Sequence, residues 1–488
     1  MRYILFILLC FAGLTLGSCK KYLEVEPKSQ RAIETVDDVK TVLAGYLKVI
    51  KPGETVTFHS SVGDVMFFTP SYWSLFEFYS DNIAWKQDYN TYINAAGAAN
   101  AKTPAKLILL NNFSISTNIW VQHYKSIGFL NVLLDELKET SGNETVKQQL
   151  RNEMLVCRAL YYYKLLQYFA PYKDAQTGIP VYTDSKGPFT GLAIPRSSQA
   201  EVFKFIIDQL TEALNSSAPT DPNYNVLYRK VFVNNFLAQV YWYKAESGAK
   251  ETGDYGLAKK YANDALSGIT LPATQTDYVN SLNGAYDYPV YQRYGGFSTF
   301  SENTYGLAFG TTAFKPHIAP DFYALFDAND YRFKTFILAN QTISRPVVTS
   351  PNNFTTAYNL FKPEEAYLIR IEATLKDPQN GSEAEARSLL NAFRRMRGVN
   401  SDYTGADIKQ EIINERRREF LFLNDFRWID MKRFGIGTTR DNMVMFGKSY
   451  TVTVEPNGYH FALPIPVDEE LRLNPAMTPN PNWNEIIF

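Results

Sequence analysis

The sequence has no excess of charge of either sign, and it is poor in the residues that build disulfides and metal sites. Its 488 residues include 49 Lys and Arg against 50 Asp and Glu, with four histidines and three cysteines. A nucleic-acid-binding protein needs a basic face to neutralise phosphates, so this balance argues against nucleic acid as a partner. Cys10, Cys19 and Cys157 show no disulfide or metal-ligand spacing. We expect Cys157, alone in a helical pattern, to be a small buried residue.

Common catalytic motifs are also absent. The chain has no H-E-x-x-H, no G-x-S-x-G and no glycine-rich phosphate loop before a helix. No histidine has another His or Cys at ligand spacing, so we interpret all four as structural: His59, His123, His317 and His460. Neighbouring carboxylates do not indicate the two facing carboxyl groups of a glycosidase; they are Asp37–Asp38, Glu364–Glu365 and Glu469–Glu470. The sequence therefore predicts a protein that is not an enzyme and needs neither a metal nor a cofactor.

The first 18 residues predict a signal peptide. Arg2 supplies a positive charge, and residues 3–16 form an apolar run that is short for a membrane-spanning helix. The run ends in Leu16-Gly17-Ser18-Cys19, and small residues just before a cysteine resemble a bacterial lipobox. We expect lipidation at Cys19 and attachment to the membrane by lipid chains alone. The alternative is an ordinary secretory peptide with a coincidental cysteine.

Aromatic residues are abundant. They make up 15% of the chain, as 33 Tyr, 33 Phe and 6 Trp. Tyrosine combines an apolar ring with a polar tip and suits surfaces that are half exposed to water. This composition fits a large helical core with tyrosines at its rim. It also permits a carbohydrate-binding surface, and composition alone does not choose between them.

Hydrophobic periodicity predicts a mostly α-helical fold. Apolar residues recur at helical spacing over 36–50, 118–139 and 145–169, and again after a cap at Ser197 or Ser198. Two helical hairpins follow, with small residues that allow close approach, at 231–244 with 257–266 and at 364–375 with 382–396. They are similar to tetratricopeptide repeats without the full consensus. We expect such hairpins to stack into a scaffold, with long irregular loops and a few short strands carrying the ligand surface.

The stretch 408–434 combines charge with strong hydrophobicity. Its first half places Glu415 and Arg418, and also Arg416 and Glu419, at the i,i+3 spacing of helical ion pairs. Its second half is apolar on all faces, which requires surrounding protein. Buried charges must be paired, so the sequence predicts these two ion pairs in a buried setting.

The same stretch resembles a known family. Glu415-Arg416-Arg417-Arg418-Glu419 followed by Arg427-Trp428-x-Asp430-x-Lys432-Arg433 is similar to the C-terminal motif of the SusD/RagB family. The tail agrees with this resemblance through Leu463-Pro464-Ile465-Pro466, Glu470-Leu471, Asn474-Pro475 and Asn480-Pro481. Before it, 450–454 alternates like a strand. We expect Glu415, Arg418 and Trp428 to be buried and to fix this tail onto the helical stack.

The resemblance implies one SusD-like domain over 19–488. Its helical scaffold would comprise about 36–50, 118–270 and 360–434, and its tail 435–488. The segments 58–117 and 270–360 depart most from the family and would face the ligand. Family members are surface lipoproteins of the outer membrane in Bacteroidetes-type bacteria. The implied partners are an oligosaccharide and a SusC-like TonB-dependent β-barrel transporter.

Aromatic and polar residues gather in both variable segments. An aromatic ring can bury the apolar face of a sugar, while Asn, Asp or Arg side chains satisfy its hydroxyl groups. The candidate ligand-binding residues are Tyr72, Trp73, Asn82, Trp85, Tyr288, Tyr291, Arg293 and Tyr294. The competing interpretation of each aromatic residue is packing within its loop.

Two other functions remain open at this point. The helical hairpins would also suit a scaffold that binds protein or peptide partners and has no small-ligand site. A surface glycosidase is the third possibility. Alanine substitutions at Trp73 and Trp85 would separate the first two, and new reducing ends in polysaccharides would reveal the third.

Overall fold

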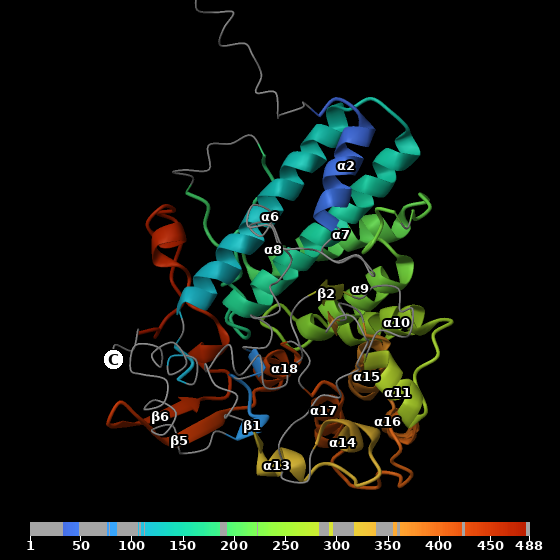
Figure 1. The fold of residues 1–488 in the computed structure, drawn as a ribbon, viewed down its shortest axis with the longest axis vertical. Coiled ribbons are helices and arrows are strands. Elements are labelled where there is room, and N and C mark those ends of the chain that lie inside the picture. The colour runs from blue at the N-terminus through green and yellow to red at the C-terminus, as the bar shows by residue number, and fades with distance from the viewer. Residues whose placement is uncertain are drawn as a thin grey trace, which may run out of the picture.

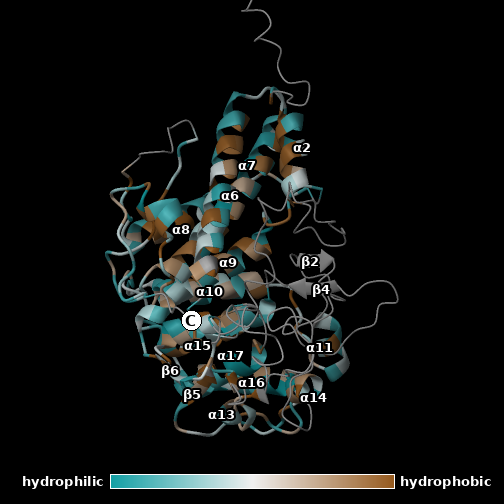
Figure 2. Cartoon of the chain, turned by 60° about the vertical axis from the view of Figure 1, so that its left-hand side comes forward, coloured by the Kyte–Doolittle hydropathy of each residue, from teal (hydrophilic) through white to brown (hydrophobic). Residues whose placement is uncertain are grey.

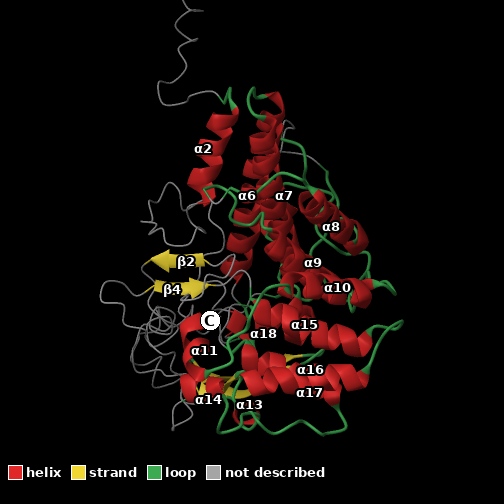
Figure 3. Ribbon diagram, turned by 90° about the vertical axis from the view of Figure 1, so that its right-hand side faces the viewer, coloured by secondary structure: helices red, strands yellow, loops and turns green. Residues whose placement is uncertain are grey.

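In a computed structural model of the chain, the structure describes residues 33–47, 76–77, 79–84, 106, 109–111, 113–185, 193–221, 223–282, 292–295, 317–337, 355–358, 362–421 and 425–484. The predicted signal peptide and Cys19 lie outside these residues. Most of the described chain is helical, as predicted (Figure 3).

The N-terminal half of the scaffold is a group of long helices. Its elements are α2 (Val36–Leu47), α6 (Phe113–Glu139), α7 (Glu144–Phe169) and α8 (Gln199–Asn215). Helix α7 contacts α2, α6 and α8, so it lies at the centre of this group (Figure 1). Hydrophobic and hydrophilic residues alternate along these helices, as expected when one face of each is buried (Figure 2).

The C-terminal half continues the stack with shorter helices. They are α9 (Lys230–Lys244), α10 (Asp254–Leu266), α15 (Pro363–Lys376), α16 (Glu383–Met396), α17 (Ile408–Glu419) and α18 (Phe426–Phe434). Helix α8 packs on α9, α9 on α10, and α10 on α15, which then contacts α16 and α17 (Figure 3). The two predicted hairpins are therefore neighbours in the stack although about 100 residues of sequence separate them.

Local sequence signals set several helix ends. Ser198, one of the two predicted caps, begins α8 and forms a capping box with Glu201. Asn143 caps α7 by accepting hydrogen bonds from the amides of residues 145 and 146. Thr35, just before α2, accepts a hydrogen bond from the Asp38 amide at 3.3 Å. Such caps satisfy N–H groups that a helix leaves without partners.

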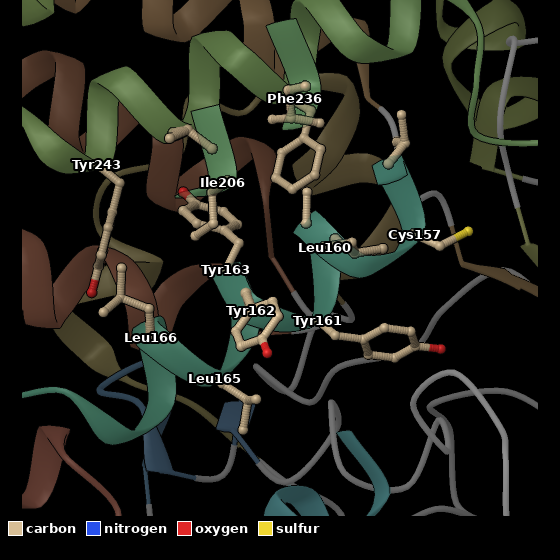
Figure 4. Close-up of a cluster of buried hydrophobic side chains, with 14 of the residues drawn as sticks. Cys157, Leu160, Tyr161, Tyr162, Tyr163, Leu165, Leu166, Ile206, Phe236 and Tyr243 are labelled. Atoms are coloured by element: carbon tan, nitrogen blue, oxygen red, sulfur yellow. The ribbon is translucent and has the colours of Figure 1, made fainter. Parts of the chain in front are cut away.

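Tyrosines occupy the centre of the scaffold as well as its rim. Helix α7 buries a run of them against α8 and α9 (Figure 4). The hydroxyl groups donate to main-chain carbonyls, as from Tyr162 to Tyr182 (2.6 Å) and from Tyr163 to Gln239 (3.1 Å). The expectation of tyrosines mainly at the rim is thus incomplete, because buried hydroxyl groups here find acceptors. Cys157 is fully buried beside them, as predicted.

In the part of the chain that the structure describes, three two-stranded antiparallel sheets lie outside the stack. Strand β1 (Ile83–Ala84) pairs with β3 (His317–Ile318), β2 (Gln292–Gly295) with β4 (Thr355–Tyr358), and β5 (Thr438–Met445) with β6 (Lys448–Val454). The predicted strand 450–454 is the end of β6. Short helices accompany the sheets: α11 (Gln275–Leu282), α13 (Pro320–Tyr323) and α14 (Tyr331–Phe336). Across the described ranges, no helix has both the length and the apolar character that crossing a membrane requires.

Candidate functional site

Helices α17 and α18 are buried at the lower end of the stack (Figure 1). Glu415, Arg418 and Trp428 are 0%, 3% and 2% exposed, which confirms their predicted burial. Arg418 donates to Glu415, so the predicted pair forms. The Trp428 ring lies 4.6 Å from the ring of Phe461 in the C-terminal tail. The motif therefore fixes the tail onto the helical stack, as expected.

The second predicted ion pair is wrong. Arg416 does not pair with Glu419 but binds Asp430 of α18, with an Nη2–Oδ1 distance of 2.9 Å. Glu419 accepts from Arg397 at 2.8 Å and from Arg332 at 3.1 Å. Helix α17 is surrounded by other elements, and these supply partners that the i,i+3 rule for exposed helices does not consider.

Arg332 contacts three carboxylates and links α14 to α17 through two of them, Glu415 and Glu419. It is fully buried and lies 2.7 Å from Asp330, 2.8 Å from Glu415 and 3.1 Å from Glu419. Burial by itself would raise the pKa of Glu415, but Arg332 and Arg418 outweigh burial and hold that pKa at about 2. Glu415 is therefore ionised at neutral pH, and it is paired with both arginines.

Two arginines of the motif hold the segment 76–84. Arg427 binds both carboxylate oxygens of Asp81, at 2.7 Å each. Arg417 donates to the Asn82 side chain at 2.8 Å and to the Asp81 carbonyl at 2.9 Å. Bidentate, charge-assisted contacts of this kind fix orientation as well as position. The described part of the first variable segment is thus attached firmly to the scaffold.

Arg417 and its neighbour Arg418 also hold the second variable segment. Arg417 donates to Asp321 at 2.8 Å, and Arg418 donates to the Leu325 carbonyl at 3.2 Å. Strands β1 and β3 join the two segments directly through the pair Ile83–Ile318. The two segments that were predicted to face the ligand therefore meet at one place, on the surface of α17.

Only some of the candidate ligand residues lie in the described ranges. Asn82 is fully buried; it donates to Glu77 at 2.6 Å and accepts from Arg417. Both ends of its amide thus have partners inside the protein, and a ligand contact there stays a prediction. Arg293 and Tyr294 belong to β2, opposite Ala357 and Thr356 of β4. The other candidates lie outside the described residues: Cys19, Tyr72, Trp73, Trp85, Tyr288 and Tyr291.

The residues that tie the segments together were not identified from the sequence. Asp81, Asp321 and Arg332 lie about 90 to 340 positions from their partners on α17 and α18, so no local spacing reveals the contacts. The composition of the motif was the available signal, because five buried charges in a row demand partners elsewhere. Within the described ranges no group of three or more His, Cys, Asp or Glu side chains is placed to hold a metal ion.

These features define a class of protein in which a helical-repeat scaffold holds internal stretches of two long variable segments. Two family models match the chain. One, described as starch-binding associating with outer membrane, matches 21–242, and the SusD family model matches 211–483. The second match covers more than half of the sequence. The chain therefore belongs to the SusD family.

Solved structures share the fold. A SusD-like carbohydrate-binding protein from Bacteroides vulgatus has 19% identity and a TM-score of 0.65, covering 91% of this chain and 97% of its own. A SusD superfamily protein from Bacteroides thetaiotaomicron has 18% identity and a TM-score of 0.66, and the match covers 92% of this chain and 100% of that protein's. A putative sugar-binding protein from Bacteroides vulgatus has 18% identity and a TM-score of 0.65, and the match covers 93% of this chain and 100% of that protein's. A search of curated proteins gave no match.

Proposed function

We propose that this protein is a cell-surface lipoprotein that binds glycans and delivers them to a SusC-like TonB-dependent outer-membrane transporter. Membership of the SusD family is the observation that carries the proposal. The related structure described as a carbohydrate-binding protein supports the choice of ligand class. The aromatic residues in the two variable segments would supply the sugar-binding surface.

The anchored stretches of these segments suit that function. A sugar is held by a few rings and polar groups, and binding weakens when these groups must first be ordered. Arg417 contacts both segments through Asn82 and Asp321, and α17 is itself buried. Side chains carried by the segments would then be presented from a rigid base, which favours precise placement.

Glycan binding is tested by electrophoresis of the mature chain through gels containing soluble starch, xylan, mannan or pectin. We expect at least one polysaccharide to retard the protein, and the double variant Trp73→Ala, Trp85→Ala to lose most of that retardation. Tyr261→Ala removes a half-buried ring on α10 and serves as the control, with retardation unchanged. Equal retardation of both variants, or none in any gel, would contradict the proposal.

The same samples distinguish the competing functions. New reducing ends after incubation with the four polysaccharides would indicate a glycosidase instead. A double variant that folds normally and loses only protein partners would indicate a scaffold for protein binding.

Membrane attachment and the transporter are tested separately. We expect the native chain to fractionate with outer membranes and to co-purify with a β-barrel transporter. Cys19→Ser removes the predicted lipid attachment point, and should release the protein into the soluble fraction. A variant that stays in the membrane fraction would refute lipid anchoring at this residue.

A further inference from the structure

A cavity of about 400 Å³ lies between the loop after α7, helix α18 and the C-terminal tail. Its lining comes from 171–174, Lys432, 457–459, 461–462 and 480–482. Pockets for small ligands start at roughly this size. None of the lining residues belongs to the variable segments 58–117 and 270–360, so the cavity is distinct from the surface proposed above.

An aromatic ring forms one wall of the cavity. Tyr459 is 38% exposed although two neighbouring rings hold it. It stacks on His460 with a centroid distance of 4.0 Å and meets Trp483 edge-on at 5.2 Å. Trp483 is fixed in turn because its indole N–H donates to the Ala462 carbonyl at 2.7 Å. The wall is therefore an exposed ring whose orientation is set in advance.

The rim of the cavity is polar. Asn457 and Asn482 are exposed, and both have left-handed backbone conformations, with φ of 59° and 68°. In the described part of the chain neither side-chain amide has a hydrogen-bond partner from the protein. Lys173 and Asp174 add exposed charges of opposite sign. An amide offers both donors and acceptors, which matches the needs of hydroxyl groups.

The deep end of the cavity is tied together by buried hydrogen bonds. Lys432 donates to the carbonyls of Gln167 and Ala170, at 2.6 and 2.7 Å. Asn480 donates to the carbonyls of Phe169 and Leu463, at 2.8 and 2.6 Å. These bonds connect the end of α7 to α18 and to the tail. The cavity is thus formed before any ligand arrives, which lowers the ordering cost of binding.

We propose that this cavity is a second carbohydrate subsite, which holds one sugar ring of a polysaccharide against Tyr459. The apolar face of a pyranose would cover the tyrosine ring, and its hydroxyl groups would reach the amides of Asn457 and Asn482. The choice of a sugar rests on the proposed function. Two separate contacts with one polymer would raise its overall affinity through effective concentration.

The tryptophans provide a test that reports on the two surfaces separately. The mature chain labelled with 5-fluorotryptophan gives six ¹⁹F resonances, one for each Trp, and single Trp→Phe variants assign them. Trp483 reports on the cavity, Trp73 and Trp85 on the variable segment, and the buried Trp120 and Trp242 serve as internal controls. The probes are glucose, galactose, mannose, xylose and glucuronic acid, each added to about 100 mM, which detects millimolar binding.

We expect at least one of these sugars to shift the Trp483 resonance saturably, while Trp120 and Trp242 do not move. Tyr459→Ala should weaken this response about tenfold. Asn482→Gly removes one rim amide, keeps the backbone conformation, and should weaken it severalfold. Leu473→Ala changes an exposed residue of the same tail outside the cavity, and should leave the response unchanged.

Two results would overturn the subsite. One is a Trp483 resonance that none of the five sugars moves. The other is a response that keeps its apparent Kd in both Tyr459→Ala and Asn482→Gly. If sugars shift only the resonances of Trp73 and Trp85, the proposed function stands and the second subsite is refuted. If only Trp483 responds, the cavity binds sugar and the variable segment does not.

Discussion

Replacing Arg427 with methionine should loosen the attachment of segment 76–84 to the scaffold. Methionine keeps much of the length and the apolar stem of arginine, and it removes the charge and both hydrogen bonds to Asp81. Asp81 would then be a carboxylate with a side chain only 14% exposed and without its main partner. Arg417 remains, with its Nη2 at 3.5 Å from the Asp81 carboxylate.

The expected loss of stability is about 3 kcal/mol. Removing one partner of a buried ion pair costs roughly 3–5 kcal/mol, and the remaining Arg417 contact and partial exposure of Asp81 favour the lower end. Burial by itself would raise the pKa of Asp81, but Arg427 outweighs burial and lowers it. The substitution should therefore raise this pKa. For a chain of this length the entropy of unfolding is about 1 kcal/mol per kelvin, so Tm should fall by about 3 °C.

Two measurements check this expectation. Calorimetry gives the change in Tm, and hydrogen exchange with mass spectrometry shows whether the amides of 79–84 exchange faster than in the native chain. Arg472→Met is the control, because Arg472 and Asp468 form a surface pair with side chains 71% and 69% exposed; its effect should stay within about 0.5 kcal/mol. If Arg427→Met changes Tm and exchange no more than the control does, the pair of Arg427 and Asp81 does not hold the segment 76–84.

Two further predictions concern the core. Burial lowers the pKa of His123 to about 3 from its ordinary 6.5. Between pH 6.5 and 3 the ring is therefore protonated in the unfolded chain but not in the folded chain. Stability should fall by up to about 1.4 kcal/mol per unit as pH drops from 6.5 towards 3. His123→Phe should show a shallower decline of Tm with falling pH than the native chain. An equal decline in both proteins would show that His123 does not contribute to the pH dependence of stability. Trp428→Ala removes ring contacts with Tyr79 and Phe461 and should cost about 3–5 kcal/mol. Limited proteolysis should then cut the tail sooner than in the surface control Val467→Ala; equal rates would show that Trp428 does not secure the tail.

Elements with a local signal were well predicted from the sequence. The helix ending at Phe169 begins beside Asn143 and carries a clear apolar period, and its observed bounds differ from the prediction by one residue. A cap at Ser197 or Ser198 was predicted, and the structure has Ser198, whose capping-box partner Glu201 lies three positions away. The SusD family was recognised from the motif on α17 and α18, and the family match confirms it.

What depends on distant contacts was predicted less well. Arg416 has Glu419 at helical spacing, yet it binds Asp430, because α17 is buried and α18 returns across it. Asn82 was predicted to contact ligand, and no signal near it in the sequence indicated that Arg417, more than 300 positions later, binds its side chain. Strand β5 has no clear alternation and is defined by its pairing with β6. The ligand candidates, including Asn82, Trp73 and Trp85, stay predictions.

The pairing of β2 with β4 has a consequence for how this protein can change its ligand. Gly295 and Thr355 are partners in the sheet, so the chain that leaves the sheet at one position returns at the other. Between them, 317–337 is fixed to α17 through Asp321, Leu325 and Arg332. Doubling the length of a flexible loop with fixed ends costs only about 0.6 kcal/mol. Insertions between the sheet and 317–337, on either side, would therefore have little effect on the helical stack, whereas deletion of 317–337 would leave Glu415 and Glu419 without Arg332. The lengths of these two stretches can thus change in evolution or engineering while the scaffold stays the same.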